Sequence, residues 1–415
     1  MSQLWQHFAT GSWLTRERLR VYSLLMGGVC LIGMIGWVAL SDGLIDRNGK
    51  PLGTDFSSFY AAGSLALEGR AGAAYDPAVH YARQQQLFGA ATPYYAWLYP
   101  PFFLFIAAPL ALLPYGLALL VWQAGSFALY LTVIGAILRR AGAGPAASLW
   151  LPIAAAFPAV FVNLGHGQNG YLTAGLFGAA LCLLRSRPLL SGVLFAMLAY
   201  KPQFALVIPL ALLAGGQWRV IAAAALTVAG LAAATTLAFG LDIWSVFAAS
   251  TELSRKLLLE QGEVGFEKLQ SAFAAIRMWG GSVSLAYGVQ TALSIMVTAG
   301  AMWVWRTAGD AAVKAAVLLL ATLLASPHTL DYDLMLLGPT IAFMVSAGLA
   351  DGFRPYEVSL LAAGWVTPLL ARLIAGALDV PLGLLMTLAL FGLVMRRALH
   401  KPSAATKDHH QIAQL

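Results

Sequence analysis

The stretch VYSLLMGGVCLIGMIGWVAL, residues 21–40, decides the class of fold. It contains no charged residue and has the length of about 20 residues that a helix needs to cross the hydrocarbon core of a bilayer. Similar runs cover most of the 415-residue chain, which is 60% hydrophobic and 10% charged, with a mean hydropathy of +0.74. In lipid only helices and closed barrels satisfy their own backbone polar groups, and these runs lack the alternation of barrel strands. The sequence therefore predicts an all-α, polytopic membrane protein.

Further apolar runs predict about 12 transmembrane helices (a range of roughly 11–13). These runs lie at residues 98–138, 146–164, 170–184, 189–200, 203–214, 219–240, 284–305, 311–325, 331–349, 356–374 and 380–395. Several are shorter than the roughly 20 residues of a straight span. Short or Pro-interrupted helices are tolerated at membrane depth where they line a cavity, and 189–214, broken at Lys201-Pro202, is the clearest example.

The basic residues predict the orientation of the chain. If 98–138 crosses the membrane once rather than twice, most Lys and Arg fall on the side of the N-terminus, and the other side carries more acidic than basic residues. This distribution is typical of a cytoplasmic N-terminal side. We therefore expect a multi-pass protein of the plasma (inner) membrane with both termini in the cytoplasm. The net charge of +7 follows from the same bias, and no basic cluster with stacking aromatics indicates nucleic acid.

Two polar loops, 41–98 and 241–283, are then expected on the extracytoplasmic face. Both are expected to carry surface helices, because Asp76-Pro77 is a typical helix start and 251–270 has apolar residues at helical spacing. No soluble domain is evident. Residues 1–400 are expected to form one membrane domain, followed by a disordered cytoplasmic tail over 401–415.

The first loop contains GTDFSSFY, residues 53–60, with a single carboxylate at Asp55. Two interpretations are open. Asp55 could cap a helix that begins at Phe56 by accepting backbone N–H groups. It could also act as a general base that takes a proton from an attacking hydroxyl. The two roles are compatible, because a cap fixes the position of a carboxylate.

Other polar motifs are expected on the same face. They are GHGQNG (165–170), YKPQ (200–203) and SPHTLDYD (326–333). His166 and His328 lie in turns, where a histidine is usually only solvated or packed, although imidazole can also donate to phosphate or sugar oxygens. Gln168 and Asn169 suit the recognition of sugar hydroxyls, or they simply end helices.

Lys201 and the pair Asp331 and Asp333 each have a structural alternative. Lys201 is either a lysine that extends toward the membrane interface or a clamp for a leaving phosphate. A D-x-D pair can hold a divalent metal for a nucleotide diphosphate. The alternative favoured here is that Asp331 and Asp333 mark a helix start, so a metal is not expected.

Taken in order, these motifs resemble glycosyltransferase family 87, polytopic enzymes of the GT-C superfamily that include polyprenol-phosphate-mannose-dependent mannosyltransferases. The likeness extends over about residues 50–345. The matching segments are DFSSFYAAG (55–63), LALEGRAGAAYD (65–76), YPPFFLFIAAPLALLP (99–114), GHGQNGYLTAGL (165–176), LLSGVLFAMLAYKPQFALVIPLALL (189–213) and SPHTLDYDLMLLGP (326–339).

The resemblance implies a GT-C type fold and an inverting transfer of a sugar, mannose being favoured, from a polyprenyl phosphate to a lipid or envelope-glycan acceptor. It implies that Asp55 is the base. One base suffices, because a phosphate leaves without being protonated. No cofactor is required, since a lipid monophosphate donor has less need of a metal. Besides membrane lipids, the donor is the main expected partner, and its phosphate or sugar is expected to contact Lys201, His328, His166, Gln168, Asn169 and Tyr60.

Two other functions compete with this one. A transporter or flippase of a lipid-linked sugar would place its polar site near the bilayer midplane, often at paired helix breaks in two repeats. Here the charged residues gather on one face and no repeat is evident. A scaffold for envelope assembly would not need an aspartate at a lipid-facing cavity.

Overall fold

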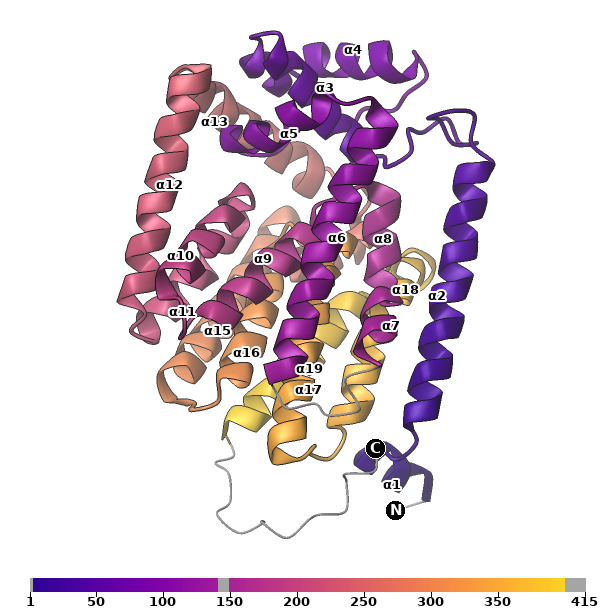
Figure 1. The fold of residues 1–415 in the computed structure, drawn as a ribbon, viewed down its shortest axis with the longest axis vertical. Helices are drawn as coiled ribbons and strands as arrows, with labels where there is room; N and C mark the ends of the chain where they lie inside the picture. Colours follow the sequence, from indigo (N-terminus) through magenta and orange to yellow (C-terminus); the bar gives the residue numbers. More distant parts are fainter. Residues whose placement is uncertain (1–2, 141–148, 400–415) are drawn as a thin grey trace.

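The computed structural model describes residues 3–140 and 149–399, and helices form nearly all of their regular structure (Figure 1). Within these residues, seven helices are long and apolar enough to cross a membrane. They are α2 (Arg16–Ala39), α6 (Tyr115–Arg140), α12 (Trp218–Phe239), α15 (Val283–Thr307), the 3₁₀ turn η8 (Asp331–Leu336) continued by α17 (Leu337–Asp351), α18 (Glu357–Leu378) and α19 (Leu382–Leu399). The prediction of an all-α membrane protein is confirmed. The predicted tail, 401–415, lies outside the described residues.

Shorter helices complete the bundle. They are α7 (Trp150–Ala155), α8 (Pro158–His166), α9 (Gly170–Leu183), α10 (Pro188–Met197), α11 (Val207–Ala214) and α16 (Ala311–Ala325). Each is shorter than the roughly 20 residues of a straight span, so length alone does not confirm the predicted total of about 12 crossings. The break predicted at Lys201 is present, because two 3₁₀ turns, Leu198–Tyr200 and Pro202–Ala205, separate α10 from α11.

The long apolar run 98–138 contains a single long helix. It begins with a 3₁₀ turn, Pro101–Phe103, and continues with the eight-residue α5 (Leu104–Ala111), which is too short to span a bilayer. After Pro114 the chain forms α6, whose last turn carries Arg139 and Arg140. The helix dipole stabilises positive charges at this C-terminal end. Within this run only α6 is long enough by itself to span a bilayer, and one crossing by 98–138 stays a prediction.

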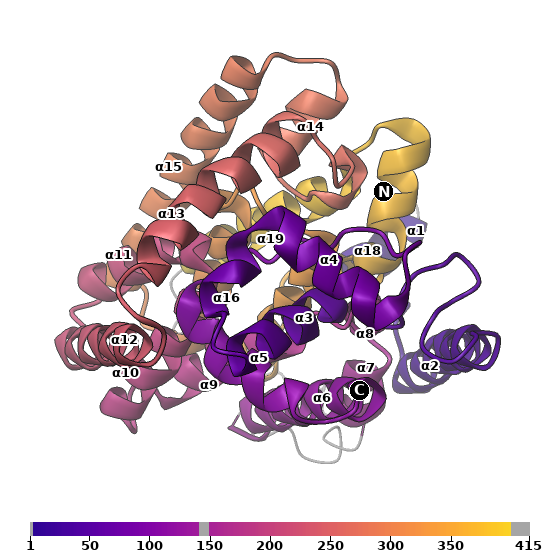
Figure 2. The same cartoon turned by 90° about the horizontal axis from the view of Figure 1, so that it is seen from above.

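A layer of helices covers one end of the bundle (Figures 1 and 2). The first loop contributes α3 (Phe56–Leu67), the 3₁₀ turn Ala71–Tyr75, α4 (Pro77–Phe88) and then α5. As predicted, Asp76 caps α4, accepting from the backbone N–H of Ala78 at 2.9 Å and of Val79 at 3.3 Å. The second loop joins this layer, because the rings of Tyr75 and Phe247 in α13 (Ile243–Ser254) lie 5.8 Å apart.

The second loop differs from the expectation of a continuous helix over 251–270. After α13 the backbone widens into a π turn, Arg255–Glu260, and a separate 3₁₀ turn, Phe266–Lys268, precedes α14 (Ala272–Met278). The left-handed Gly262 and Gly265 between the turns end the helix, because only glycine adopts positive φ without strain.

The opposite end of the bundle carries both ends of the described chain. The first helix, α1 (Gln3–Thr10), meets the turn before α18, where the Tyr356 N–H donates to the Ala9 carbonyl at 2.8 Å. Arg396, in the last turn of α19, donates to the Pro355 carbonyl of the same turn at 2.6 Å. The described termini therefore lie on one side, away from the layer of α3 and α4 (Figure 1).

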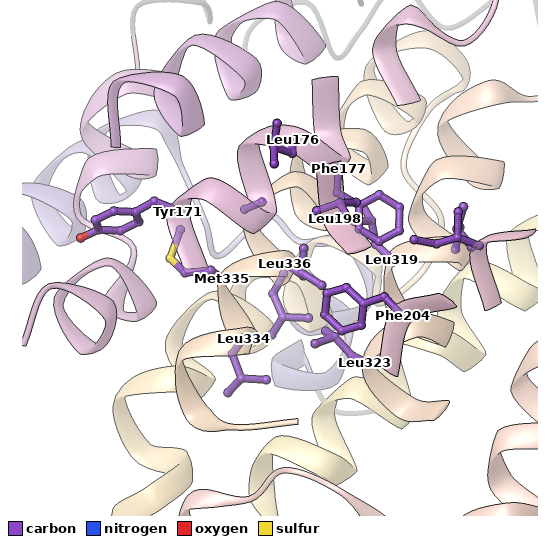
Figure 3. Close-up of a cluster of buried hydrophobic side chains, with 14 of the residues drawn as sticks. Tyr171, Leu176, Phe177, Leu198, Phe204, Leu319, Leu323, Leu334, Met335 and Leu336 are labelled. Atoms are coloured by element: carbon purple, nitrogen blue, oxygen red, sulfur yellow. The ribbon is translucent and has the colours of Figure 1, made fainter. Parts of the chain in front are cut away.

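A buried apolar cluster holds the polar turns in place (Figure 3). Tyr171 and Phe177 from α9, Phe204 from the 3₁₀ turn after Lys201, and Leu334 and Met335 from η8 are nearly fully buried. These elements follow or contain the motifs 165–170, 200–203 and 326–333. Their packing therefore brings three polar segments, distant in sequence, beside one another.

Candidate active site

Asp55 lies one residue before α3, and its side chain does not cap that helix. Its Oδ2 instead accepts a hydrogen bond from Gln168 Nε2 at 3.0 Å, and its backbone N–H donates to the His166 carbonyl at 3.0 Å. The capping interpretation is therefore wrong, because the Asp55 carboxylate turns toward the 165–170 segment. The side chain is 28% exposed, so it remains open to a reactant.

Close packing of the turn at Gly53 against the turn at Gly167 explains the position of Asp55. Gly53 and Gly167 both have positive φ, and a Cβ on Gly167 would lie 2.6 Å from Phe56 Cβ and 3.0 Å from the Gly53 oxygen. The long helix α6 supports both turns. Its Tyr115 hydroxyl donates to the Leu52 carbonyl at 2.6 Å, and Trp122 Nε1 donates to the Gly167 carbonyl at 3.0 Å.

Tyr99 fixes the orientation of the Gln168 amide. The Tyr99 hydroxyl donates to Gln168 Oε1 at 3.0 Å and accepts from Asn169 Nδ2 at 2.8 Å. Burial raises the pKa of the Tyr99 hydroxyl well above its usual value, so the hydroxyl keeps its proton and remains a donor. With Oε1 engaged in this way, Gln168 must present its N–H group to Asp55.

The sequence interpretation missed Tyr99 as a site residue. It stands directly before Pro100 and Pro101 in the YPPFF segment. A tyrosine beside two prolines at the start of an apolar run was the available signal.

His166 lies between two carboxylates. Its Nδ1 is 4.0 Å from Asp55 Oδ2, and its Nε2 is 4.0 Å from Asp331 Oδ2. The Thr54 hydroxyl, which the sequence interpretation also missed, lies 3.2 Å from Nδ1. The imidazole is half-buried, and its two ring nitrogens face different carboxylates.

Lys201 forms a buried ion pair with Asp333. The side chains are only 4% and 2% exposed, and the ammonium also lies 5.1 Å from the centre of the Tyr332 ring. The interpretation of Lys201 as a lysine extending to the membrane interface is therefore wrong. A cation in so apolar a site needs a charged partner, and Asp333 provides one.

The D-x-D pair is divided between different partners. Asp333 also accepts from the Leu330 N–H at 3.0 Å, at the start of η8, so its predicted place at a helix start is confirmed. Asp331 faces His166 and accepts from the Tyr332 N–H at 2.8 Å. Among residues 3–140 and 149–399, no group of three or more His, Cys, Asp or Glu side chains could hold a metal ion.

His328 lies beside this ion pair, and Tyr60 lies outside the cluster. The His328 ring is half-buried, and burial lowers its pKa to about 4 against the opposing effect of the Asp333 charge. It is therefore neutral at pH 7. Tyr60 instead donates to the Leu113 carbonyl at 2.8 Å and packs against Tyr115, so the structure does not bring it to Asp55.

Comparison with family models decides the family. The model of glycosyltransferase family 87 matches residues 97–327, which is more than half of the chain. This protein belongs to glycosyltransferase family 87. Searches of curated proteins and of solved structures found no match.

The matched region contains only part of the candidate site of this family 87 glycosyltransferase. It includes Tyr99, the 165–170 segment and Lys201, whereas Asp55 precedes it, and His328 and the D-x-D pair follow it. The hydrogen bond between Gln168 and Asp55 joins the matched region to the first loop. The site of this membrane glycosyltransferase thus combines an accessible carboxylate with amide, imidazole and buried ammonium groups, a set suited to proton transfer and to binding oxygen-rich substrates.

Proposed function

We propose that this protein is an inverting glycosyltransferase that moves a sugar from a polyprenyl-phosphate donor to a lipid or envelope-glycan acceptor. Mannose is the donor sugar that the family resemblance favours. Transfer would take place on the extracytoplasmic face of the plasma membrane, with both termini in the cytoplasm and about 12 crossings, the short helices serving as spans that line a cavity. One observation supports the proposal above all others. The Asp55 carboxylate is held by Gln168, is not used as a cap and is 28% exposed.

In the proposed reaction the acceptor hydroxyl oxygen attacks the anomeric carbon of the donor sugar. The bond from that carbon to the phosphate oxygen breaks, and the electron pair leaves with the polyprenyl phosphate. Asp55 takes the proton of the acceptor hydroxyl as the new glycosidic bond forms. Attack opposite the leaving phosphate inverts the anomeric configuration, and the phosphate needs no second carboxylate to protonate it.

The neighbouring side chains have proposed binding roles. Neutral His328 would donate to a phosphate or sugar oxygen, and Gln168 would hold Asp55 in the orientation that accepts the proton. Lys201 is paired with Asp333 in the structure, so a donor phosphate would have to displace that carboxylate to reach the ammonium. Asn169, which is fully buried, would act through Tyr99 rather than on the sugar directly.

Transfer of radiolabelled sugar from polyprenyl-phosphate mannose to an envelope lipid extract tests the proposal. Wild-type protein in lipid is compared with Asp55→Asn, which keeps the size of the side chain and removes the base. We expect Asp55→Asn to lower the transfer rate on the order of a hundredfold or more. The matched control is Asp42→Asn, which removes an exposed carboxylate from the same loop.

Two outcomes would contradict parts of the proposal. Full activity of Asp55→Asn would show that this carboxylate is not the base. No transfer by the wild type from any polyprenyl-phosphate sugar would favour the flippase alternative, which translocation of a labelled lipid-linked sugar in liposomes would then examine.

A further inference from the structure

A cavity of about 420 Å³ lies at the end of the bundle away from Asp55. It opens where α6, α9, α16 and α17 meet, and Arg140, Arg185 and Lys314 line it. Arg140 is the last residue of α6, roughly 27 Å along the helix axis from Trp122, which supports the Asp55 site. This cavity is therefore separate from the candidate active site.

Among the described residues the cavity collects positive charge without a balancing carboxylate, and Arg140 donates to the Cys182 backbone carbonyl. Its lining contains no Asp or Glu, and within residues 3–140 and 149–399 none of its three cations forms an ion pair. Asp310, the nearest acidic residue in sequence to Lys314, is used as the cap of α16 and accepts from the Ala312 N–H at 2.7 Å. Arg140 and Arg185 are exposed and Lys314 is half-buried, so water screens part of their mutual repulsion, and an anion lying among them would relieve the rest.

A second cavity of about 330 Å³ continues the first. The two share Leu184, Arg185 and Gln217, and the second adds Arg219 and the exposed Trp218. The positive-inside rule explains why basic residues occur at this end of the helices. It does not explain why four of them, contributed by segments far apart in the chain, line two adjoining cavities.

The remaining lining is amphipathic. Gln217, Ser186 and Ser346 provide neutral hydrogen-bonding groups, whereas Trp305 and Phe343 form apolar walls. Trp305 is fixed in place because its Nε1 donates to the Lys314 carbonyl at 2.9 Å. Cations beside apolar walls suit a phosphate group attached to a hydrocarbon chain, as basic pockets between membrane helices do for anionic lipid head groups.

We propose that this basic cavity, lined by Arg140, Arg185, Lys314 and Arg219 in its two parts, binds the phosphate group of an anionic phospholipid. The phosphate lies among the cations, and the start of an acyl chain lies on the apolar side of the cavity, behind which Trp305 and Phe343 are buried. A free phosphate or pyrophosphate offers the same charged group without the chain. The test therefore separates the two sources.

The test measures lipid retained by the purified full-length protein in native mass spectrometry. Protein is supplied with phosphatidylglycerol or with phosphatidylcholine, and wild type is compared with the double variant Arg185→Gln, Lys314→Gln. Each cation near an anionic lipid contributes about fivefold in affinity, so the double variant is expected to bind phosphatidylglycerol about 25-fold more weakly. The matched control is Arg187→Gln, Arg306→Gln, which removes two exposed cations outside the cavity.

A second arm measures the melting temperature of lipid-free protein with inorganic phosphate or pyrophosphate. The melting temperature measured without ligand also shows whether the double variant is folded. Retention of phosphatidylglycerol that falls in the double variant but not in the control supports the lipid source. Stabilisation by pyrophosphate alone, lost in the double variant, supports a phosphate site with a soluble source and overturns the lipid part. Equal losses in both variants, equal retention of phosphatidylcholine, or no binding of any phosphate overturns the proposal.

Discussion

Gln168 Nε2 donates to Asp55 Oδ2 at 3.0 Å, although the two residues are separated by 113 positions in the chain. The amide comes from the turn after α8 and the carboxylate from the start of α3. We predict that Gln168→Met, which removes the donor and keeps a similar length, lowers kcat about 10- to 100-fold. The reason is that a hydrogen bond to a charged group contributes about 1.5–3 kcal/mol.

The transfer assay checks this prediction, with the melting temperature as a control for folding. Gln86→Met, on the exposed side of α4, should leave kcat unchanged. An active Gln168→Met protein with wild-type kcat would show that Asp55 does not depend on this hydrogen bond.

The buried ion pair of Lys201 and Asp333 predicts a mutational asymmetry. Removing either partner alone, by Lys201→Met or Asp333→Asn, leaves the other charge buried and should destabilise the protein by about 3–5 kcal/mol. Removing both should cost much less, because no unpaired charge remains. Thermal unfolding in detergent measures the three variants. Additive losses in the double variant would mean that the two charges do not depend on each other.

His328 predicts a dependence of stability on pH. Its pKa is about 4 in the folded protein, below the ordinary value of 6.5, so the unfolded chain binds a proton that the folded protein does not over this interval. The free energy of unfolding therefore falls as the pH drops from about 6.5 toward 4, because protonation of His328 favours the unfolded chain. We expect the wild type to lose about 1–2 kcal/mol more than His328→Gln between pH 8 and pH 5.

Melting temperatures across this pH range check the His328 prediction. His80 is buried and also has a pKa of about 4, so part of the pH dependence should persist in His328→Gln. His7→Gln, at an exposed position of α1, should follow the wild type. If the curves of His328→Gln and wild type have the same slope, His328 is not buried in its neutral form.

Gly63 predicts a steric requirement between α3 and α5. A Cβ at this position would overlap the backbone carbonyl of Ala107, and backbone cannot turn aside as a flexible side chain can. Gly63→Ala should therefore push α3, and Asp55 at its start, away from α5, lowering both the melting temperature and the transfer rate. Gly33→Ala in α2, where a Cβ would meet nothing, is the control. Equal behaviour of the two variants would contradict the close packing of α3 on α5.

The sequence indicated the polar segments of the site because each is a turn that interrupts apolar runs. GHGQNG ends one helix and starts the next, and Asp55 stands where a polar loop returns to apolar sequence. The partners of these residues were harder to predict. Lys201 and Asp333 are 132 residues apart, and nothing local to either residue specifies the other.

The sequence pattern also could not specify in which direction a side chain points or how long each helix is. Tyr60 shares the segment of Asp55 but lies five positions further on, which is more than one turn of α3, so it faces Tyr115 instead. The number of membrane crossings could not be predicted from the apolar runs. Such a run indicates apolar surroundings, but it does not show whether a helix continues through a proline or is interrupted by a 3₁₀ turn, as at Lys201.

The 26-residue helix α6 is about 39 Å long, which exceeds the roughly 30 Å of an average hydrocarbon core. Such a helix adapts to its membrane by tilting. Because its first turns support both the Leu52 and the Gly167 turns, a change of tilt would shift the two sides of the Asp55 site together with their support. The enzyme would then respond to the thickness of the bilayer around it, with its rate changing as the acyl chains of the surrounding lipid are lengthened or shortened.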